Sequence, residues 1–243
     1  MNARTERTVP LPPMQRLAAE HLARSLRESV PVTIHGVVDA EALLELRARL
    51  AAERPAGPRI TLTHLVVKAV AQALRSHAGL NATLKERTVT LHGAVHIGIA
   101  QALPDGHLVV PVLHDADCRD IDALATAAID LAALAVAGKL RLPDVQGATF
   151  TVSNGGALAS VRWTTPIIPL GQAAILGLGA VHEAPVAREG AVIVRRLLPT
   201  SLSFDHRFVN GVPAARFLDE VHQLIAEPQR IRLGADTEEE PPC

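Results

Sequence analysis

Apolar residues recur along the chain at two spacings, one typical of helices and one typical of strands. Apolar residues three or four positions apart predict helices over 14–29, 40–53, 63–77, 121–137 and 213–226. Asp39 is placed to cap the second of these helices, and Gly138 is placed to end the fourth. Pro31 is expected to separate the first helix from the strand that follows it.

Segments in which apolar residues alternate with polar ones, or continue without interruption, predict the strands. They cover 32–38, 88–92, 95–100, 108–113, 148–152, 173–178, 191–197 and 200–204. A short turn at Gly93 is expected to join the second and third strands. The run 108–113 is almost wholly apolar, which predicts burial on both faces. Helices and strands follow no regular β-α-β repeat, and no glycine-rich fingerprint follows a strand, so the pattern excludes a Rossmann or P-loop domain.

Length and composition favour a single large domain. The chain has 243 residues, of which 48% are apolar and 2% aromatic, so a core must rest on aliphatic side chains. No linker rich in glycine, serine or proline divides the chain. We predict an extended arm over 1–13, a domain over 14–233 and a disordered acidic tail over 234–243.

Charge and cysteine content exclude several classes of protein. The 24 basic residues nearly balance the 25 acidic ones, which argues against a nucleic-acid partner. No apolar run reaches about 18 residues and no signal peptide is recognised, so no membrane association is expected. Cys118 and Cys243 make no disulfide framework and fit a reducing cytoplasm. No cysteine or histidine cluster has metal-ligand spacing, so no metal is expected.

Candidate chemistry concentrates in residues 203–211, which read Ser-Phe-Asp-His-Arg-Phe-Val-Asn-Gly. His206 stands there beside Asp205, Arg207 and Asn210, after an apolar run. An unperturbed imidazole gains and loses a proton near neutral pH, which suits general acid-base catalysis. A lone histidine after a strand is more often structural, so the surrounding pattern decides between the two interpretations.

That pattern resembles a known signature. Asp-His-Arg-x-x-Asn-Gly, followed by Ala-Ala-Arg-Phe-Leu at 214–218, is similar to the motif of the dihydrolipoamide acyltransferase catalytic domain of 2-oxoacid dehydrogenase complexes. Other segments resemble the same family in the same order: 14–16 with 32–33, then 96–100 with 106–112, then 138–140 with 149–154, 165–169 and 172–179. The resemblance spans roughly residues 8–233, nearly the whole chain.

The resemblance implies a fold and a reaction. The fold is that of chloramphenicol acetyltransferase, a mixed α/β (α+β) domain with a mixed sheet flanked by helices. The reaction moves an acyl group between coenzyme A and a dihydrolipoyl thiol. In the family, the histidine matching His206 is the general base, and the serine matching Ser153 donates to the oxyanion. Residues 153–156 also fit a simple turn, while Asn210 is expected to organise the site by hydrogen bonding.

The sequence departs from the family at three places. Asn210 stands where most members carry an aspartate, although asparagine also occurs there, and it cannot supply a charge. The helix segment 131–137 lacks basic residues that members often have there, which weakens attraction for an acidic cofactor or partner domain. Gly155 stands where the family usually has an apolar residue.

The family also implies partners. This sequence carries no lipoyl domain, so it is either a stand-alone domain or a fragment. As it stands, the lipoyl group is expected on a separate protein, with further 2-oxoacid dehydrogenase subunits as partners. The active site is expected between neighbouring subunits of a homotrimer. Some relatives form a 24-subunit cube through an apolar C-terminal anchor. Here Arg230 and Arg232 interrupt the corresponding segment 228–233, and acidic residues follow at 236–240. These charges favour the trimer.

Two alternatives stay open at this point. One is a coenzyme A-dependent acyltransferase that acts on another small acceptor. The other is a catalytically silent core that assembles other subunits, although such a scaffold has no need for His206 or Ser153.

Overall fold

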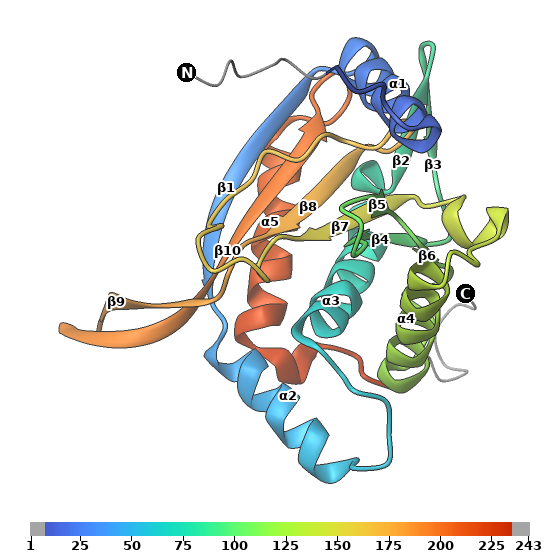
Figure 1. Cartoon of the computed structure of the whole chain (residues 1–243). Coiled ribbons are helices and arrows are strands. Elements are labelled where there is room, and N and C mark those ends of the chain that lie inside the picture. The colour runs from blue at the N-terminus through green and yellow to red at the C-terminus, as the bar shows by residue number, and fades with distance from the viewer. Residues whose placement is uncertain (1–7, 235–243) are drawn as a thin grey trace, which may run out of the picture.

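The structure, a computed structural model that describes residues 8–234, packs helices against a mixed β-sheet (Figure 1). The helices are α1 (Pro13–Glu28), α2 (Glu41–Glu53), α3 (Leu62–Ser76), α4 (Ile121–Val136) and α5 (Gly211–Ala226). Short 3-10 turns occur at η1 (Ala78–Leu80), η2 (Leu142–Val145) and η3 (Pro228–Arg230). Each helix matches a predicted one to within about two residues at either end.

The main sheet has eight strands in the order β1-β10-β8-β7-β4-β5, with β6 paired to β4 and β9 paired to β10. Its strands are β1 (Pro31–Asp39), β4 (Ile97–Ala102), β5 (Leu108–Val109), β6 (Val112–Leu113), β7 (Phe150–Asn154), β8 (Ala174–Leu178), β9 (His182–Arg188) and β10 (Ala191–Asp205). The pairs β4–β7 and β7–β8 are parallel, whereas β10 runs antiparallel to both β8 and β1. A separate hairpin consists of β2 (Ala82–Lys85) and β3 (Thr88–Leu91).

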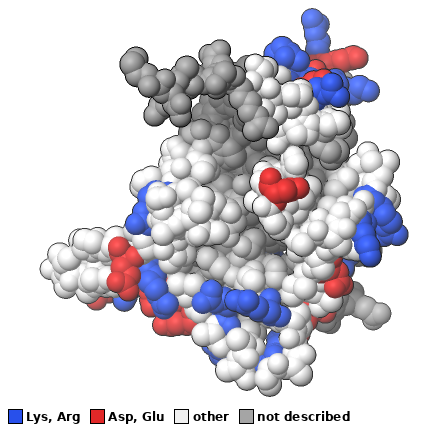
Figure 2. Space-filling model, viewed as in Figure 1, with Lys and Arg blue, Asp and Glu red and all other residues white. Residues whose placement is uncertain are grey.

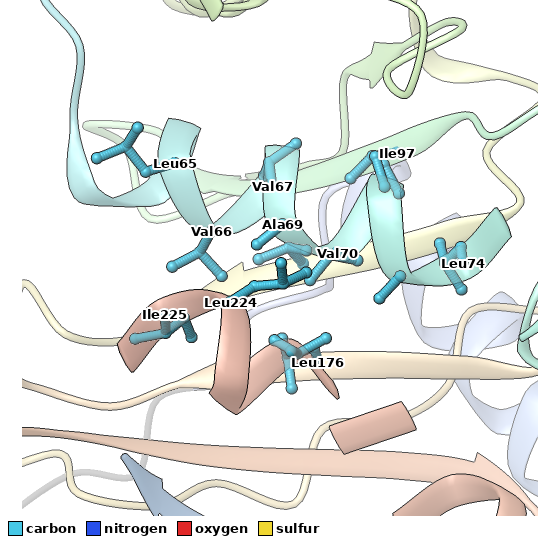
Figure 3. Close-up of a cluster of buried hydrophobic side chains, with 14 of the residues drawn as sticks. Leu65, Val66, Val67, Ala69, Val70, Leu74, Ile97, Leu176, Leu224 and Ile225 are labelled. Carbon is cyan, nitrogen blue, oxygen red and sulfur yellow. The ribbon is translucent and has the colours of Figure 1, made fainter. Parts of the chain in front are cut away.

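Helix α3 lies at the centre of the core and packs between α4 and α5 (Figures 1 and 3). Its apolar stripe, which includes Leu65, Val66 and Val70, is fully buried. The helix begins with a capping box: Thr61 Oγ1 accepts from His64 N, and Thr61 N donates to His64 Nδ1. Because this ring nitrogen accepts, it carries no proton. Burial agrees with this, since it lowers the pKa of His64 to about 4.

Strand β10 is the longest strand and positions the His206 motif at its end. It replaces the two strands predicted over 191–197 and 200–204. Pro199 lies within it without breaking the pairing to β1. The Pro199 carbonyl accepts from Gly179 N, and Gly179 lies just beyond the end of β8. Because the N and O atoms of one strand residue face the same side, the Pro199 nitrogen, which has no hydrogen, also faces the region beyond β8. A proline is tolerated at such a position because no ladder hydrogen bond is lost.

The β9–β10 hairpin extends from the body of the molecule as an arm (Figure 1). Val192 and Val194 on this arm are 76% and 61% exposed. Ion pairs between Arg195 and Asp39 and between Arg196 and Glu41 hold its base to the junction of β1 and α2.

Several predicted elements differ from the structure. The segment 108–113 forms two short strands, because Pro111 interrupts the ladder, and Leu108 is 64% exposed rather than buried. The strands on either side of Gly93 do not pair with each other, since β3 pairs with β2 and β4 joins the main sheet. Strands β2 and β9 were not predicted. Ala40, not Asp39, is the N-cap residue of α2, although Asp39 Oδ1 accepts from Glu41 N.

Two further expectations concern the whole chain. Among the described residues, no helix has the length and apolarity needed to cross a membrane. Cys118 is disulfide-bonded, whereas the other cysteine lies outside the described residues. The cysteines therefore give no support to the expected reducing cytoplasm. Most of the predicted arm over 1–13 and nearly all of the predicted tail over 234–243 also lie outside the described residues.

Candidate active site

His206 is the first residue after β10, and its side chain is exposed. Its backbone N–H donates to Val30 O at 2.9 Å, which ties it to the junction of α1 and β1. The imidazole packs beside the buried ring of Phe204, with 5.6 Å between the ring centroids. No hydrogen bond joins the imidazole to another of the described residues. The ring is therefore accessible from solvent.

Asp205 and Arg207, which flank His206, pair with each other. Asp205 is 2% exposed, and its Oδ2 lies 2.6 Å from Arg207 Nη2. Its Oδ1 accepts from the backbone N–H groups of Val30 at 3.2 Å and Arg207 at 3.1 Å. Burial by itself would raise the pKa of Asp205, but the hydrogen bonds from Arg207 and Val30 outweigh burial and hold the pKa below its usual range. The carboxylate is thus charged at neutral pH.

Ser153 lies near the end of β7, between the parallel neighbours β4 and β8. The flanking Val152 belongs to the hydrophobic core, so the alternation along a strand turns Ser153 to the opposite face of the sheet. The residue is half-buried, and its hydroxyl makes no hydrogen bond within the described part of the chain. The hydroxyl is therefore free to donate to a bound group.

The turn after Ser153 contains the interactions expected of its sequence. Asn154 Oδ1 accepts from Gly156 N at 2.7 Å, and its Nδ2 donates to Thr63 Oγ1 on α3 at 2.8 Å. A Cβ atom added at Gly155 would lie 3.1 Å from Val161 Cγ1, and one at Gly156 would lie 2.6 Å from a backbone oxygen. The glycine at 155 therefore lets the loop at Val161 lie close against the turn.

Ser153 and His206 do not meet within one chain. Ser153 pairs with Gly177 on β8, and Gly177 pairs with Ser201 on β10. His206 follows Ser201 by five residues. At the usual spacings, this places the two residues roughly 16 Å apart along the strands and about 10 Å apart across them. A catalytic base and an oxyanion donor must both lie about 3 Å from the reacting group, so Ser153 and His206 of one chain cannot act together on one such group.

Asn210 and Gly211 lie at the start of α5, four and five residues after His206. Asn210 is the N-cap residue, but its exposed side chain makes no capping hydrogen bond. Sterics do not require a glycine at 211, because a Cβ added at Gly211 would meet nothing within 4 Å.

Other histidines have partners that fit structural roles. His35 Nδ1 lies 2.9 Å from Ser201 Oγ, and His96 Nδ1 accepts from Asp115 N. His92 and His96 line a cavity of about 420 Å³ with Thr83 and Thr149. None of the predicted catalytic residues lines this cavity, so it does not mark the candidate site. Within the described ranges, no group of three or more side chains is arranged to hold a metal ion.

On the face shown in Figure 2, basic and acidic side chains lie in separated groups, and one acidic group lies near the middle of the face. This face has no continuous basic surface of the kind that binds nucleic acid.

The sequence pattern of 2-oxoacid dehydrogenases acyltransferase (catalytic domain) matches residues 3–233. The chain belongs to this family. It is 35% identical over 227 residues to the dihydrolipoyllysine-residue acetyltransferase component of the acetoin cleaving system of Bacillus subtilis, covering 93% of this chain and 56% of the relative. It is 34% identical over 239 residues to a succinyltransferase component of the 2-oxoglutarate dehydrogenase complex of Haemophilus influenzae, covering 96% and 57%. The chain thus spans little more than half the length of these relatives.

Solved structures agree with this placement. A dihydrolipoamide acetyltransferase of Azotobacter vinelandii superposes with a TM-score of 0.89 at 33% identity, over 93% of this chain and 94% of that one. The cubic core of a pyruvate dehydrogenase multienzyme complex gives the same TM-score, at 34% identity and the same coverage. Chloramphenicol acetyltransferase, at 13% identity and a TM-score of 0.53 over 85% and 94% of the two chains, shows the shared fold. The expected fold is therefore confirmed.

Proposed function

We propose that this protein is a dihydrolipoamide acyltransferase that moves an acyl group between coenzyme A and a dihydrolipoyl thiol. The observation that carries the proposal is the match to the Azotobacter enzyme, whose structure belongs to a study of one serine, one histidine and one asparagine in its catalytic mechanism. The histidine and the asparagine are four residues apart there, as are His206 and Asn210 here. Ser153 precedes both in this chain, as the serine does in that enzyme.

In the proposed reaction, His206 removes the proton from the attacking thiol. The thiolate attacks the thioester carbonyl, and the resulting oxyanion accepts a hydrogen bond from the Ser153 hydroxyl. The tetrahedral intermediate collapses, and the imidazolium returns its proton to the departing thiolate. The accessible ring of His206 and the unpaired hydroxyl of Ser153 suit these two roles. Asn210, at the start of α5, is proposed to orient groups around the histidine by hydrogen bonding.

The separation of Ser153 and His206 implies that two chains build each site. We infer a homotrimer in which Ser153 of one subunit faces His206 of the next. In a closed ring each subunit contributes both ends of its sheet, so three equal sites result. Coenzyme A is a substrate in this scheme. A dihydrolipoyl group is the other substrate, and other subunits of a 2-oxoacid dehydrogenase complex are the proposed partners.

A thiol-release assay tests the proposal directly. Acetyl-, isobutyryl- and succinyl-coenzyme A are offered in turn with free dihydrolipoamide, and release of coenzyme A is followed. We expect turnover with at least one donor, and its absence with a non-thiol acceptor of the same size. Release that is equally fast with a hydroxyl acceptor would instead support an acyltransferase acting on another small acceptor. No release with any donor would leave a scaffold as the function.

A further inference from the structure

We propose that Asp205 is a positioning residue for His206, and this inference rests on the proposed role of His206 as the general base. The carboxylate touches neither substrate nor imidazole. It acts by fixing the main chain on both sides of the histidine.

Hydrogen bonds between Val30 and both Asp205 and His206, and from Arg207 to Asp205, hold the main chain on both sides of His206; together they form the Asp205 bracket. On one side, Asp205 Oδ1 accepts from Val30 N, while His206 N donates to Val30 O. Val30 thus binds both residues through both of its backbone groups. On the other side, Arg207 returns to the carboxylate with its backbone N–H at 3.1 Å and with its Nε at 3.0 and 2.9 Å. The residue between these anchors therefore has little freedom in its main chain.

The site around the carboxylate is built for an ionised acceptor. The side chain of Asp205 is 3% exposed, whereas that of Arg207 is 38% exposed and reaches it from the surface. Both carboxylate oxygens are occupied by donors, and guanidinium donors bind both of them. Two-point pairing of this kind fixes direction as well as distance. An amide in place of the carboxylate would present N–H groups to Arg207 and break the bracket on that side.

The bracket controls where the imidazole lies. Residues 204 and 206 are two positions apart at the strand end, and the His206 ring lies against the ring of Phe204. Phe204 is fully buried and fixed by the core, so a shift of the main chain at His206 moves the imidazole relative to it. A displacement of about 1 Å in a catalytic group can cost about 10²-fold in rate. Loss of the bracket should therefore act on the chemical step.

The test compares Asp205→Asn with a matched control, Glu41→Gln. Glu41 also makes a two-point ion pair with an arginine, Arg196, which lies within β10 nine residues before Asp205. For Asp205→Asn we expect kcat to fall about 10- to 100-fold, with KM for acyl-coenzyme A and dihydrolipoamide within about twofold. For Glu41→Gln we expect little change in kcat, whatever its effect on thermal stability.

A second background separates positioning from a general loss of folded protein. In His206→Ala there is no imidazole to position, so adding Asp205→Asn should cost less than about twofold in the residual rate. An equal loss in both backgrounds would overturn the proposal, as would an unchanged kcat for Asp205→Asn. If Asp205→Asn does not fold, Arg207→Lys replaces it, because this exposed side chain keeps the charge and loses only the two-point geometry. Activity retained in His206→Ala alone would instead contradict the proposed function.

Discussion

Ser153 and His206 stand at opposite ends of the central sheet, two strands apart, on elements that pair with a common neighbour, β8. The sheet register makes this separation rigid, because it is fixed by backbone hydrogen bonds over several residues of each strand. No side-chain movement brings the two together within one subunit. The proposed catalysis by both residues therefore depends on assembly, which makes assembly a testable part of the proposal.

His206→Ala should lower the acyl-transfer rate by at least about 10²-fold, the usual scale for a general base. Folding should be unaffected, since the imidazole makes no hydrogen bond with the described residues and is exposed. Steady-state rates with the best acyl-coenzyme A donor, beside a thermal melt, measure both effects. A variant that keeps most of its activity would remove His206 from the mechanism.

Ser153→Ala should lower kcat by about 10²- to 10³-fold, the cost of losing one oxyanion donor. KM should change far less, because the hydroxyl acts on the transition state rather than on bound substrate. Separate measurement of kcat and KM for each substrate distinguishes the two roles. If only KM rises, Ser153 is a binding residue.

Mixing the two inactive variants should restore activity. When Ser153→Ala and His206→Ala chains assemble at random in equal amounts, about a quarter of the interfaces combine an intact serine with an intact histidine. Co-expressed mixed trimers should thus regain about a quarter of the wild-type rate. The control is the double variant co-expressed with the wild type in equal amounts. In that mixture, too, about a quarter of all interfaces combine an intact serine with an intact histidine. Mixed single variants with no activity beyond that of either alone would show that each chain holds its own complete site.

Light scattering should give a mass near three chains of 25.8 kDa each, not near 24 chains. The segment that would serve as an apolar anchor is already engaged, since Ile231 is 5% exposed and belongs to the core of its own chain. Arg230 and Arg232 would add a desolvation cost to any docking of this segment. A mass near 24 chains would mean that Ile231 leaves its own core on assembly.

Acid should destabilise the fold through His64. Burial lowers its pKa to about 4 in the folded chain from the ordinary value of 6.5, so between these values the unfolded chain binds a proton that the folded chain does not. Stability should therefore be constant above about pH 6.5 and fall as the pH drops towards 4, by up to about 3 kcal/mol. Urea melts across this range measure the change. His64→Gln should flatten the pH dependence; an unaltered slope would show that other groups cause it.

Much of this architecture follows from local sequence. The predicted helices match because helical periodicity depends on residues three or four positions apart, and α3, with Leu65, Val66 and Val70 on one face, is the clearest case. The Asp205–Arg207 pair is equally local. Short apolar runs carried less information, as the misassigned segment 108–113 shows, because a strand's neighbours and exposed faces are set by distant parts of the chain.

The sequence by itself determined the helices, the family motif and the identity of His206, Ser153 and Asn210 as candidates, because each depends on residues close together along the chain. The tertiary structure decided the rest. Only the fold brings Val30 to Asp205, across 175 positions of sequence. Only the sheet order places Ser153 and His206 at opposite ends. The physical reason is that strand order and register depend on hydrogen bonds between segments far apart in the chain, and no local pattern of hydrophobicity encodes them.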